Sequence, residues 1–253
     1  MRGYYIYKRD STGNFSLIDS TANLTYTDLN FNPGDEYFVE ALKDGACPYA
    51  NQLNRLGAPS AFSVRSNKLQ IGIPTSVSIS GAIITETGIP VPGVIVTLSG
   101  SDNQADFTST DGRYNFTVVP GGNYTISALK MNDLTSNNGI TTLDVLHMRR
   151  HILNILQLPS PYKIIAADVD GSGTVTTLDI MHTSSLIIQI SLTFHNGRLW
   201  SFVPGDHVFA DNLNPFPFPT AKTYTNLQQS VTNQDFIGIK LGDVNDTWNA
   251  GIQ

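Results

Sequence analysis

The sequence predicts a mainly β protein in which tandem β-sandwiches are followed by a small module of two loops and two helices. Short runs of alternating apolar and polar residues, bounded by Gly, Pro and Asn, recur through the first half of the chain and are typical of half-buried strands. An acidic twelve-residue loop followed by an apolar segment then occurs twice, at Asp133 and 35 positions later at Asp168. Such repetition indicates one structural unit used twice. The 253 residues suffice for two to three domains.

Residues 1–65 are expected to form a partial β-sandwich. The expected strands are Tyr4–Tyr7, Asn14–Ile18, Thr25–Leu29 and Glu36–Ala41. Their order resembles the later strands of a fibronectin type III domain, with Tyr37 in the place of the tyrosine-corner residue. The first two strands and the core Trp of such a domain have no counterpart, so either another segment completes the sheet or the chain begins within the domain.

A linker is expected over residues 66–75 and a second domain over residues 76–130. Alternating apolar positions are Val94, Val96 and Leu98 in one strand and Tyr114 and Phe116 in another. Asp111-Gly112 fits a hairpin turn. This set resembles the carboxypeptidase regulatory-like, or transthyretin-like, β-sandwich. The resemblance implies a stalk or spacer module without catalytic residues of its own, and we expect the segment to fold alone.

The loop over residues 168–179 has the layout of a calcium-binding loop. Ca²⁺ takes six to eight oxygen ligands, and such loops supply them from positions 1, 3, 5, 7 and 12. The expected ligands are Asp168, Asp170, Ser172, the backbone carbonyl of Thr174, and Asp179. Gly173 occupies position 6, where the chain must turn sharply. Three carboxylates packed this closely repel one another without a cation. The alternative is an acidic surface turn that binds no metal.

The loop over residues 133–144 aligns with the first but is poorer in carboxylates. Its expected ligands are Asp133, Thr135, Asn137, the backbone carbonyl of Gly139, and Asp144. Asn138 stands where glycine is expected, although Asn tolerates the left-handed conformation better than most residues. We expect this loop to bind calcium more weakly than the loop at Asp168. The alternative is a degenerate loop that is closed by hydrogen bonds.

A helix is expected after each loop. In the first helix an apolar stripe recurs at Val145, Met148, Ile152 and Ile155, widened by Leu146, Leu153 and Leu156. The sequence Pro159-Ser-Pro161 ends this helix. The second helix, from Leu178 to Ile190, is less regular because Thr183-Ser-Ser185 consists of poor helix formers.

Two loop-and-helix repeats that each end in Asp at position 12 resemble a dockerin domain. Asn138–Leu153 and Ile165–Asp170 carry the resemblance most closely, and residues 131–247 are expected to form this module with an aromatic-rich tail. The resemblance implies calcium-dependent folding and a face that binds a protein partner. Dockerins that bind cohesins usually carry matched recognition residues at loop positions 10 and 11, where both loops here have Thr-Leu.

The tail has two readings. Its aromatic residues are Trp200, Phe202, Phe209, Phe216, Phe218 and Trp248. They either dock the tail onto the dockerin-like core or form a sugar-binding platform. Gly242–Asn245 echoes the start of a calcium loop and is a weaker ligand candidate.

Composition narrows the function classes. The chain is low in charge, at 14% charged residues, and carries a net charge of −6, so a nucleic-acid binder with a basic patch is not expected. Cys47 is the single cysteine, which excludes an internal disulfide. The chain therefore either stays in a reducing compartment or is stabilised outside the cell by other means, such as calcium, and we favour the second alternative. No apolar run reaches transmembrane length, so membrane insertion is not expected. The start of the chain does not resemble a signal peptide, and we expect a piece of a longer exported protein.

These observations favour a non-catalytic, calcium-stabilised segment of a large bacterial surface or secreted protein. It would build a stalk, filament or adhesive appendage, with other modules or subunits of a surface assembly, a surface glycan or a cell target as partners. No catalytic constellation is recognised in the sequence. The alternatives are a dockerin-type module for a cohesin-like partner and the ancillary region of a secreted hydrolase.

Overall fold

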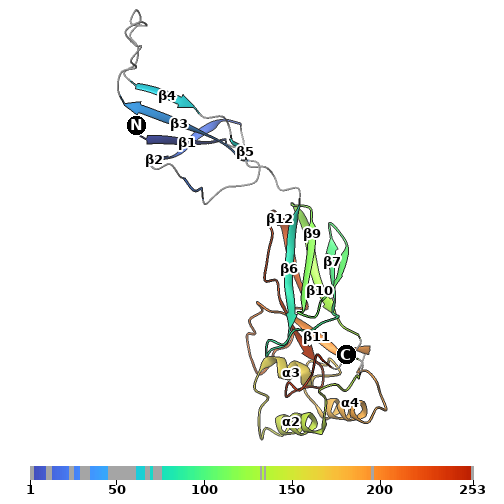
Figure 1. Ribbon diagram of the computed structural model, residues 1–253. Coiled ribbons are helices and arrows are strands. Elements are labelled where there is room, and N and C mark those ends of the chain that lie inside the picture. The colour runs from blue at the N-terminus through green and yellow to red at the C-terminus, as the bar shows by residue number, and fades with distance from the viewer. Residues whose placement is uncertain are drawn as a thin grey trace, which may run out of the picture. The chain divides into compact units, whose positions relative to one another are not determined.

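The computed structural model describes residues 3–9, 13–22, 26–28, 35–44, 61–65, 69–70, 76–131, 133, 135–194 and 197–251. The chain divides into two compact units, Met1–Thr75 and Ser76–Gln253 (Figure 1). Over the described residues the protein is mainly β, with three sheets and three helices that follow the first ten strands, which confirms the predicted fold class. Cys47 and all of the expected linker except Leu69–Gln70 lie outside the described residues.

The first unit is built on one antiparallel sheet. Its strands are β1 (Gly3–Arg9), β2 (Phe15–Thr21), β3 (Glu36–Asp44), β4 (Ala61–Arg65) and β5 (Leu69–Gln70). They are ordered β2-β1-β3-β4, and β5 also pairs with β3. The strands expected at Tyr4–Tyr7, Asn14–Ile18 and Glu36–Ala41 are confirmed as β1, β2 and β3. Residues 26–28 of the expected strand Thr25–Leu29 are not in a strand.

Tyr37 anchors a polar cluster in this sheet. Its ring is buried, and its hydroxyl donates a hydrogen bond of 2.7 Å to Asp28 Oδ2. Lys8 Nζ pairs with Asp35 Oδ2 at 2.7 Å and with Asp28 Oδ2 at 3.1 Å. Burial raises the pKa of Tyr37 to about 12, so the hydroxyl stays protonated and keeps donating. The likeness to a fibronectin type III domain stays a prediction.

The second unit contains two four-stranded sheets. The strands are β6 (Val77–Ile84), β7 (Ile95–Gly100), β8 (Gln104–Phe107), β9 (Arg113–Val118), β10 (Gly122–Leu129), β11 (Trp200–Pro204), β12 (Ala221–Leu227) and β13 (Phe236–Lys240). One sheet has the order β12-β10-β7-β8 and the other β11-β13-β6-β9. Inward-facing side chains of both sheets, including Ile79, Val96, Phe116 and Ile126, form one core. The predicted alternation is therefore observed: Val94, Val96, Leu98, Tyr114 and Phe116 are buried, whereas the residues between them are half-buried in the first segment and exposed in the second.

Strands from the tail complete both sheets. β12 pairs with β10, and β13 lies between β11 and β6, where it runs parallel to β6. Residues 76–130 thus share their core with residues 200–240 in one compact unit. If β6 paired with β9 alone, its other edge would have no hydrogen-bonding partner, which explains why β13 adds at that edge. The expected boundary at residue 130 stays a prediction.

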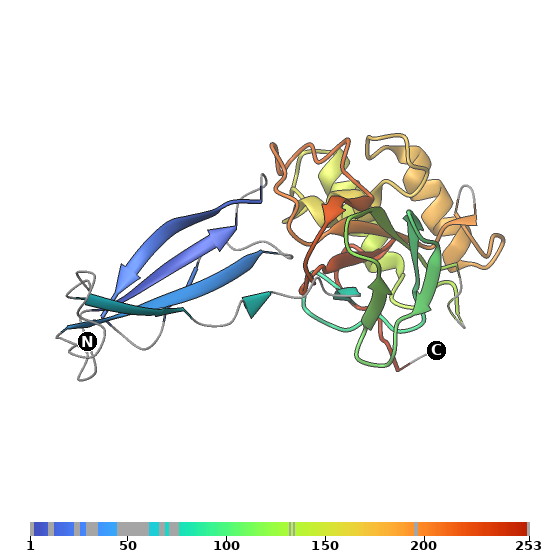
Figure 2. The same ribbon diagram turned by 90° about the horizontal axis from the view of Figure 1, so that it is seen from above.

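The three helices lie together at one side of the second unit, as Figures 1 and 2 show. They are α2 (Thr142–Ile152), α3 (Pro161–Ala167) and α4 (Thr177–Ile187). None of the described helices is long and apolar enough to cross a membrane.

The apolar stripe predicted for the first helix is only partly buried. Met148 is fully enclosed and receives a contact of 3.8 Å from the hydroxyl of Thr183 on α4. The remaining stripe residues that the structure shows as exposed are Leu146, Leu153, Ile155 and Leu156. Leu153, Ile155 and Leu156 lie beyond the helix, since α2 ends at Ile152, and Leu146 lies on a face of α2 that is not buried against α4.

α3 was not expected, although its signals are local. Ser160 is the N-cap, and its hydroxyl accepts a hydrogen bond of 3.2 Å from the backbone N–H of Lys163. Pro161 occupies the first helical position, where its missing N–H costs nothing. The Pro159-Ser-Pro161 sequence therefore starts α3, and the expectation that it ends the first helix was wrong, because α2 already ends at Ile152.

The aromatic tail packs into the core. Trp200 and Trp248 are buried and meet edge to face, with ring centroids 4.8 Å apart. Phe202 is also buried, whereas Phe209, Phe216 and Phe218 are half-buried. These three pack against a separate buried cluster that includes Met148 of α2 and Ile164 of α3. This burial agrees with the reading in which the tail docks, and it removes Trp200, Phe202 and Trp248 from a surface platform.

Candidate metal centre

The loop between α3 and α4 brings three carboxylates together. Asp168 follows the last residue of α3, and Asp179 is the third residue of α4. One carboxylate oxygen from each of Asp168, Asp170 and Asp179 lies within 4.8 Å of the others. Asp168 and Asp179 are buried, and Asp170 is half-buried. These residues form a compact oxygen cluster of the kind that hard cations prefer.

Backbone N–H groups hold the carboxylates in place. Asp168 accepts hydrogen bonds of 2.9 Å from the N–H groups of Ser172 and Gly173. Asp179 accepts from the backbone and hydroxyl of Thr176 at 2.8 and 3.1 Å, and also from the N–H of Asp170 at 3.2 Å. Gly173 has φ +82°, which explains the glycine at this turn.

The remaining expected ligands lie beside this cluster. The Ser172 hydroxyl is 3.3 Å from Asp168 Oδ1 and donates to the Thr174 carbonyl at 3.1 Å. The Ser172 hydroxyl therefore lies next to the carboxylate cluster, and the Thr174 carbonyl lies next to that hydroxyl. Their spacing along the chain is local, so the loop conformation alone is enough to assemble them.

The electrostatics of the cluster favour a cation. Burial raises the pKa of Asp168 and of Asp179, because it disfavours their charged forms. Burial also raises the pKa of Asp170, but hydrogen bonds from Ser172 outweigh this effect and the net pKa is lowered. Among the residues that the structure describes, no Lys, Arg or His forms an ion pair with these three carboxylates. The charge of the loop is thus left for an external cation, and the oxygen donor set fits Ca²⁺.

The loop at Asp133 is arranged differently. Asp133 Oδ2 contacts Lys240 Nζ and accepts a hydrogen bond of 3.1 Å from the indole N–H of Trp200. Burial lowers the pKa of Lys240, and the carboxylate of Asp133 opposes that shift. Within the described part of the chain, Asp133 and Asp144 do not join a group of three or more metal-ligating acids or histidines.

Other expected ligands of this loop are engaged by the protein. Asp144 Oδ1 accepts from the N–H of Val244 at 2.9 Å, and its other oxygen caps α2 through Thr141. The Gly139 carbonyl accepts a hydrogen bond of 2.7 Å from the Thr247 hydroxyl. For Thr135 and Asn137 it is the backbone carbonyls, and not the side chains expected as ligands, that accept turn hydrogen bonds of 3.0 and 2.8 Å.

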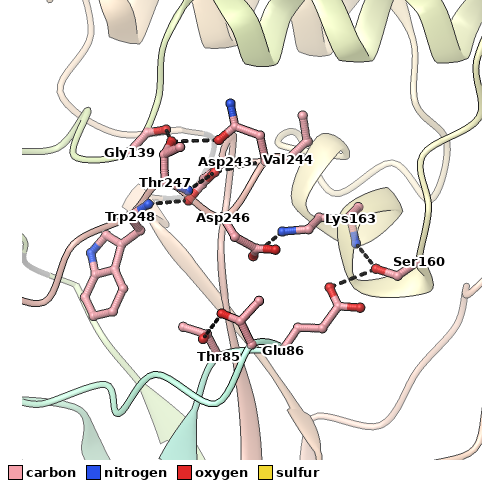
Figure 3. A network of polar contacts seen from close by, with 12 residues as sticks. Thr85, Glu86, Gly139, Ser160, Lys163, Asp243, Val244, Asp246, Thr247 and Trp248 are labelled. Atoms are coloured by element: carbon pink, nitrogen blue, oxygen red, sulfur yellow. Dashed lines mark hydrogen bonds and ion pairs between the residues drawn. The ribbon is translucent and has the colours of Figure 1, made fainter.

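The segment 242–249 contacts the loop at Asp133, where Thr247 meets Gly139 (Figure 3). Asp243 accepts hydrogen bonds from the N–H groups of Asn245 and Thr247, each 3.2 Å, and from that of Trp248 at 2.8 Å. Its carboxylate therefore stabilises its own turn, and burial raises its pKa. Figure 3 also shows the ion pair between Lys163 and Asp246, which ties this segment to α3.

The sequence did not predict that Lys240 pairs with Asp133 or that the Asp243 carboxylate accepts hydrogen bonds from its own turn. The signal for Asp243 was local, since Asp, Asn and Thr two residues apart favour turns in which a side chain accepts from the backbone. Lys240 carried no local signal, because its partner Asp133 lies 107 residues away.

Comparisons with known proteins agree with this layout. Residues 78–144 match the carboxypeptidase regulatory-like domain, and residues 131–184 match the dockerin type I domain. The two matches overlap in the loop at Asp133. No curated protein sequence matches the chain.

Two solved structures show weak similarity. The C-terminal fragment of pilus adhesin SpaC from Lactobacillus rhamnosus GG is 13% identical, with a TM-score of 0.21, over 51% of this chain and 67% of that one. The group B streptococcus pilus 2b backbone protein is 14% identical, with a TM-score of 0.20, over 51% of this chain and 64% of that one. The family matches are the informative result: the chain carries a carboxypeptidase regulatory-like domain followed by a dockerin type I domain.

Proposed function

We propose that this chain is a non-catalytic, calcium-stabilised structural segment of a large surface or secreted protein. The observation that carries the proposal is the cluster of Asp168, Asp170 and Asp179, in which no carboxylate forms an ion pair with a basic side chain among the described residues. The dockerin type I match over the same loop supports it. Other modules or subunits of an extracellular assembly would be its partners.

A calcium ion at this cluster would join two helices. Asp168 belongs to the end of α3 and Asp179 to the start of α4, so a shared ion holds the two helix ends together. An ion that binds only the folded state stabilises it by about 4 kcal/mol at a thousandfold excess over Kd. This is a large share of the roughly 5–15 kcal/mol by which domains are stable. Calcium would therefore stabilise the fold in a chain that cannot form an internal disulfide, because it has one cysteine.

Calorimetry and thermal unfolding test the calcium site. We expect the full chain to bind Ca²⁺ and to unfold at a lower temperature in EDTA. Asp168→Ala should abolish most binding at this loop, because it removes the position-1 carboxylate. Asp211→Ala is the matched control, since Asp211 is an exposed loop residue whose carboxylate accepts a hydrogen bond of 2.8 Å from the nearby N–H of Leu213. An unfolding midpoint that is the same in Ca²⁺ and in EDTA would refute the proposal.

A second candidate function is recognition of a cohesin-like partner. The residues at loop positions 10 and 11 are Thr142-Leu143 and Thr177-Leu178, and all four are exposed at the starts of α2 and α4. Leu143 is 49% and Leu178 45% exposed, which is high for apolar side chains. Exposed apolar residues at matched positions of both repeats support a binding face.

Pull-down experiments distinguish the two candidates. If the module binds a cohesin-like protein, a single stoichiometric partner should be retained in Ca²⁺ and released in EDTA. Leu143→Asp with Leu178→Asp should abolish retention, whereas Leu213→Asp, at an exposed leucine outside the helices, should not. Equal retention by both variants would count against this face.

A further inference from the structure

The loop at Asp133 differs from the loop at Asp168 in where its positive charge comes from. The side chains of Asp133 and Lys240 are both buried, at 0% and 3% exposure, and they form an ion pair. We infer that the ammonium group of Lys240 is the resident cation of the loop at Asp133, where it takes the role that we propose for Ca²⁺ in the loop at Asp168.

The surroundings of Asp133 stabilise an ammonium ion. The Trp200 indole N–H donates to the same carboxylate oxygen at 3.1 Å, and Lys240 Nζ lies 5.6 Å from the centroid of the Trp200 ring. Asp133 Oδ1 has no hydrogen-bond partner in the described structure, so the ion pair is its main compensation. Removing one partner of such a buried pair leaves an uncompensated charge.

A second lysine makes the site unfavourable for a divalent ion. Lys130 is buried, and its Nζ donates to the Pro92 carbonyl at 2.9 Å. Asp133 interacts electrostatically with both Lys130 and Lys240. A divalent ion beside Asp133 would be repelled by these two ammonium groups.

The remaining oxygens of this loop are unsuited or engaged. Positions 3 and 5 carry neutral Thr135 and Asn137, whereas the second loop has Asp170 at position 3. The carbonyl at position 7 accepts from Thr247, and Asp144 at position 12 accepts from Val244 and from Thr141. A metal would have to displace these protein contacts as well as Lys240.

Chain topology explains how the lysine reaches the loop. Lys240 is the last residue of β13, which is fixed between β11 and β6. The segment that follows folds back so that Thr247 and Val244 contact the same loop. The tail therefore supplies the cation and the hydrogen-bond donors together, and this loop closes without calcium.

Calcium stoichiometry on the full chain tests the inference, which rests on the proposed function only for the loop at Asp168. We expect one Ca²⁺ per chain for the unmodified protein, one for Asp133→Asn, and none for Asp168→Ala. A single Ca²⁺ that persists in Asp168→Ala and disappears when Asp133→Asn is added would overturn the inference. Absence of any binding to the unmodified chain would instead count against the proposed function.

A double-mutant cycle in EDTA tests the ion pair independently of calcium. We expect the destabilisation caused by Lys240→Met to be smaller in the Asp133→Asn background, with a coupling of about tenfold in the unfolding equilibrium constant. The control cycle combines Lys222→Met with Asp206→Asn, a pair at 3.1 Å whose aspartate is 74% exposed. Its coupling should be about threefold or less. Equal coupling in the two cycles would refute the inference, and if Lys240→Met does not fold, the stoichiometry of Asp168→Ala still decides.

Discussion

Gly139 offers a direct test of how the tail closes over the loop at Asp133. It has φ +80°, and a Cβ there would lie 2.5 Å from both the N and the Cα of Trp248. A side chain costs about 1–2 kcal/mol in this left-handed conformation. Forced overpacking adds about 1–3 kcal/mol. We therefore expect Gly139→Ala to lower the free energy of unfolding by about 2–5 kcal/mol, since the contact involves backbone that cannot rotate away.

Gly88→Ala is the matched control. Gly88 has φ +83°, but no atom lies within 4 Å of an added Cβ, so only the conformational cost of about 1–2 kcal/mol applies. Urea unfolding followed by tryptophan fluorescence reports on the second unit, because both tryptophans of the chain, Trp200 and Trp248, belong to it. Equal losses for the two variants would refute the close approach of Trp248 to the loop.

Three further predictions concern the same unit. In EDTA, the unfolding midpoint should fall as pH rises through the raised pKa values of Asp168 and Asp179, because burial favours their protonated forms in the folded state. Saturating Ca²⁺ binds the ionised forms and should remove this fall. Thermal melts between about pH 4 and 8 in EDTA and in Ca²⁺ measure both effects. Ser160→Ala should cost about 0.5–2 kcal/mol in chemical denaturation, because the hydroxyl caps α3, and an unchanged midpoint would contradict that cap. A fragment of residues 76–130 should be less stable by circular dichroism than residues 76–253, because it lacks β12 and β13; equal stability would show that these strands contribute little.

Local patterns in the sequence were sufficient for the strands and for the loop at Asp168. Alternation along Val94–Leu98 locates β7, since successive side chains of a strand point to opposite faces. The cluster of Asp168, Asp170 and Asp179 was predictable because a twelve-residue loop sets their separation. Whether these ligands hold calcium stays a prediction.

Contacts between distant segments were not predictable in this way. Periodicity indicated a helix after the loop at Asp133. It could not show that Leu146 would stay exposed while Met148 is fully buried and contacts Thr183 of α4. The pairing of Lys240 with Asp133 depends on β13 entering the sheet beside β6, which is a property of the whole fold. A single sequence contains no local pattern that predicts which strand pairs with β6, or which residues of the two strands lie opposite one another.

The parallel pairing of β6 with the tail determines how this unit would respond to tension along the chain. The backbone N–H of Ser80 donates to the Val231 carbonyl at 3.0 Å, and those of Val231 and Gln234 donate to the carbonyls of Ser78 and Ser80 at 2.8 and 3.0 Å. Further along, β13 pairs in parallel with β6, with Phe236 opposite Ile83. A pull applied before β6 and after β13 acts on the opposite ends of two parallel segments. These bonds are then loaded in shear and must break together, whereas a hairpin pulled from its open end unzips one bond at a time. We therefore expect the order in which the tail joins the sheet to make the unit resist stretching.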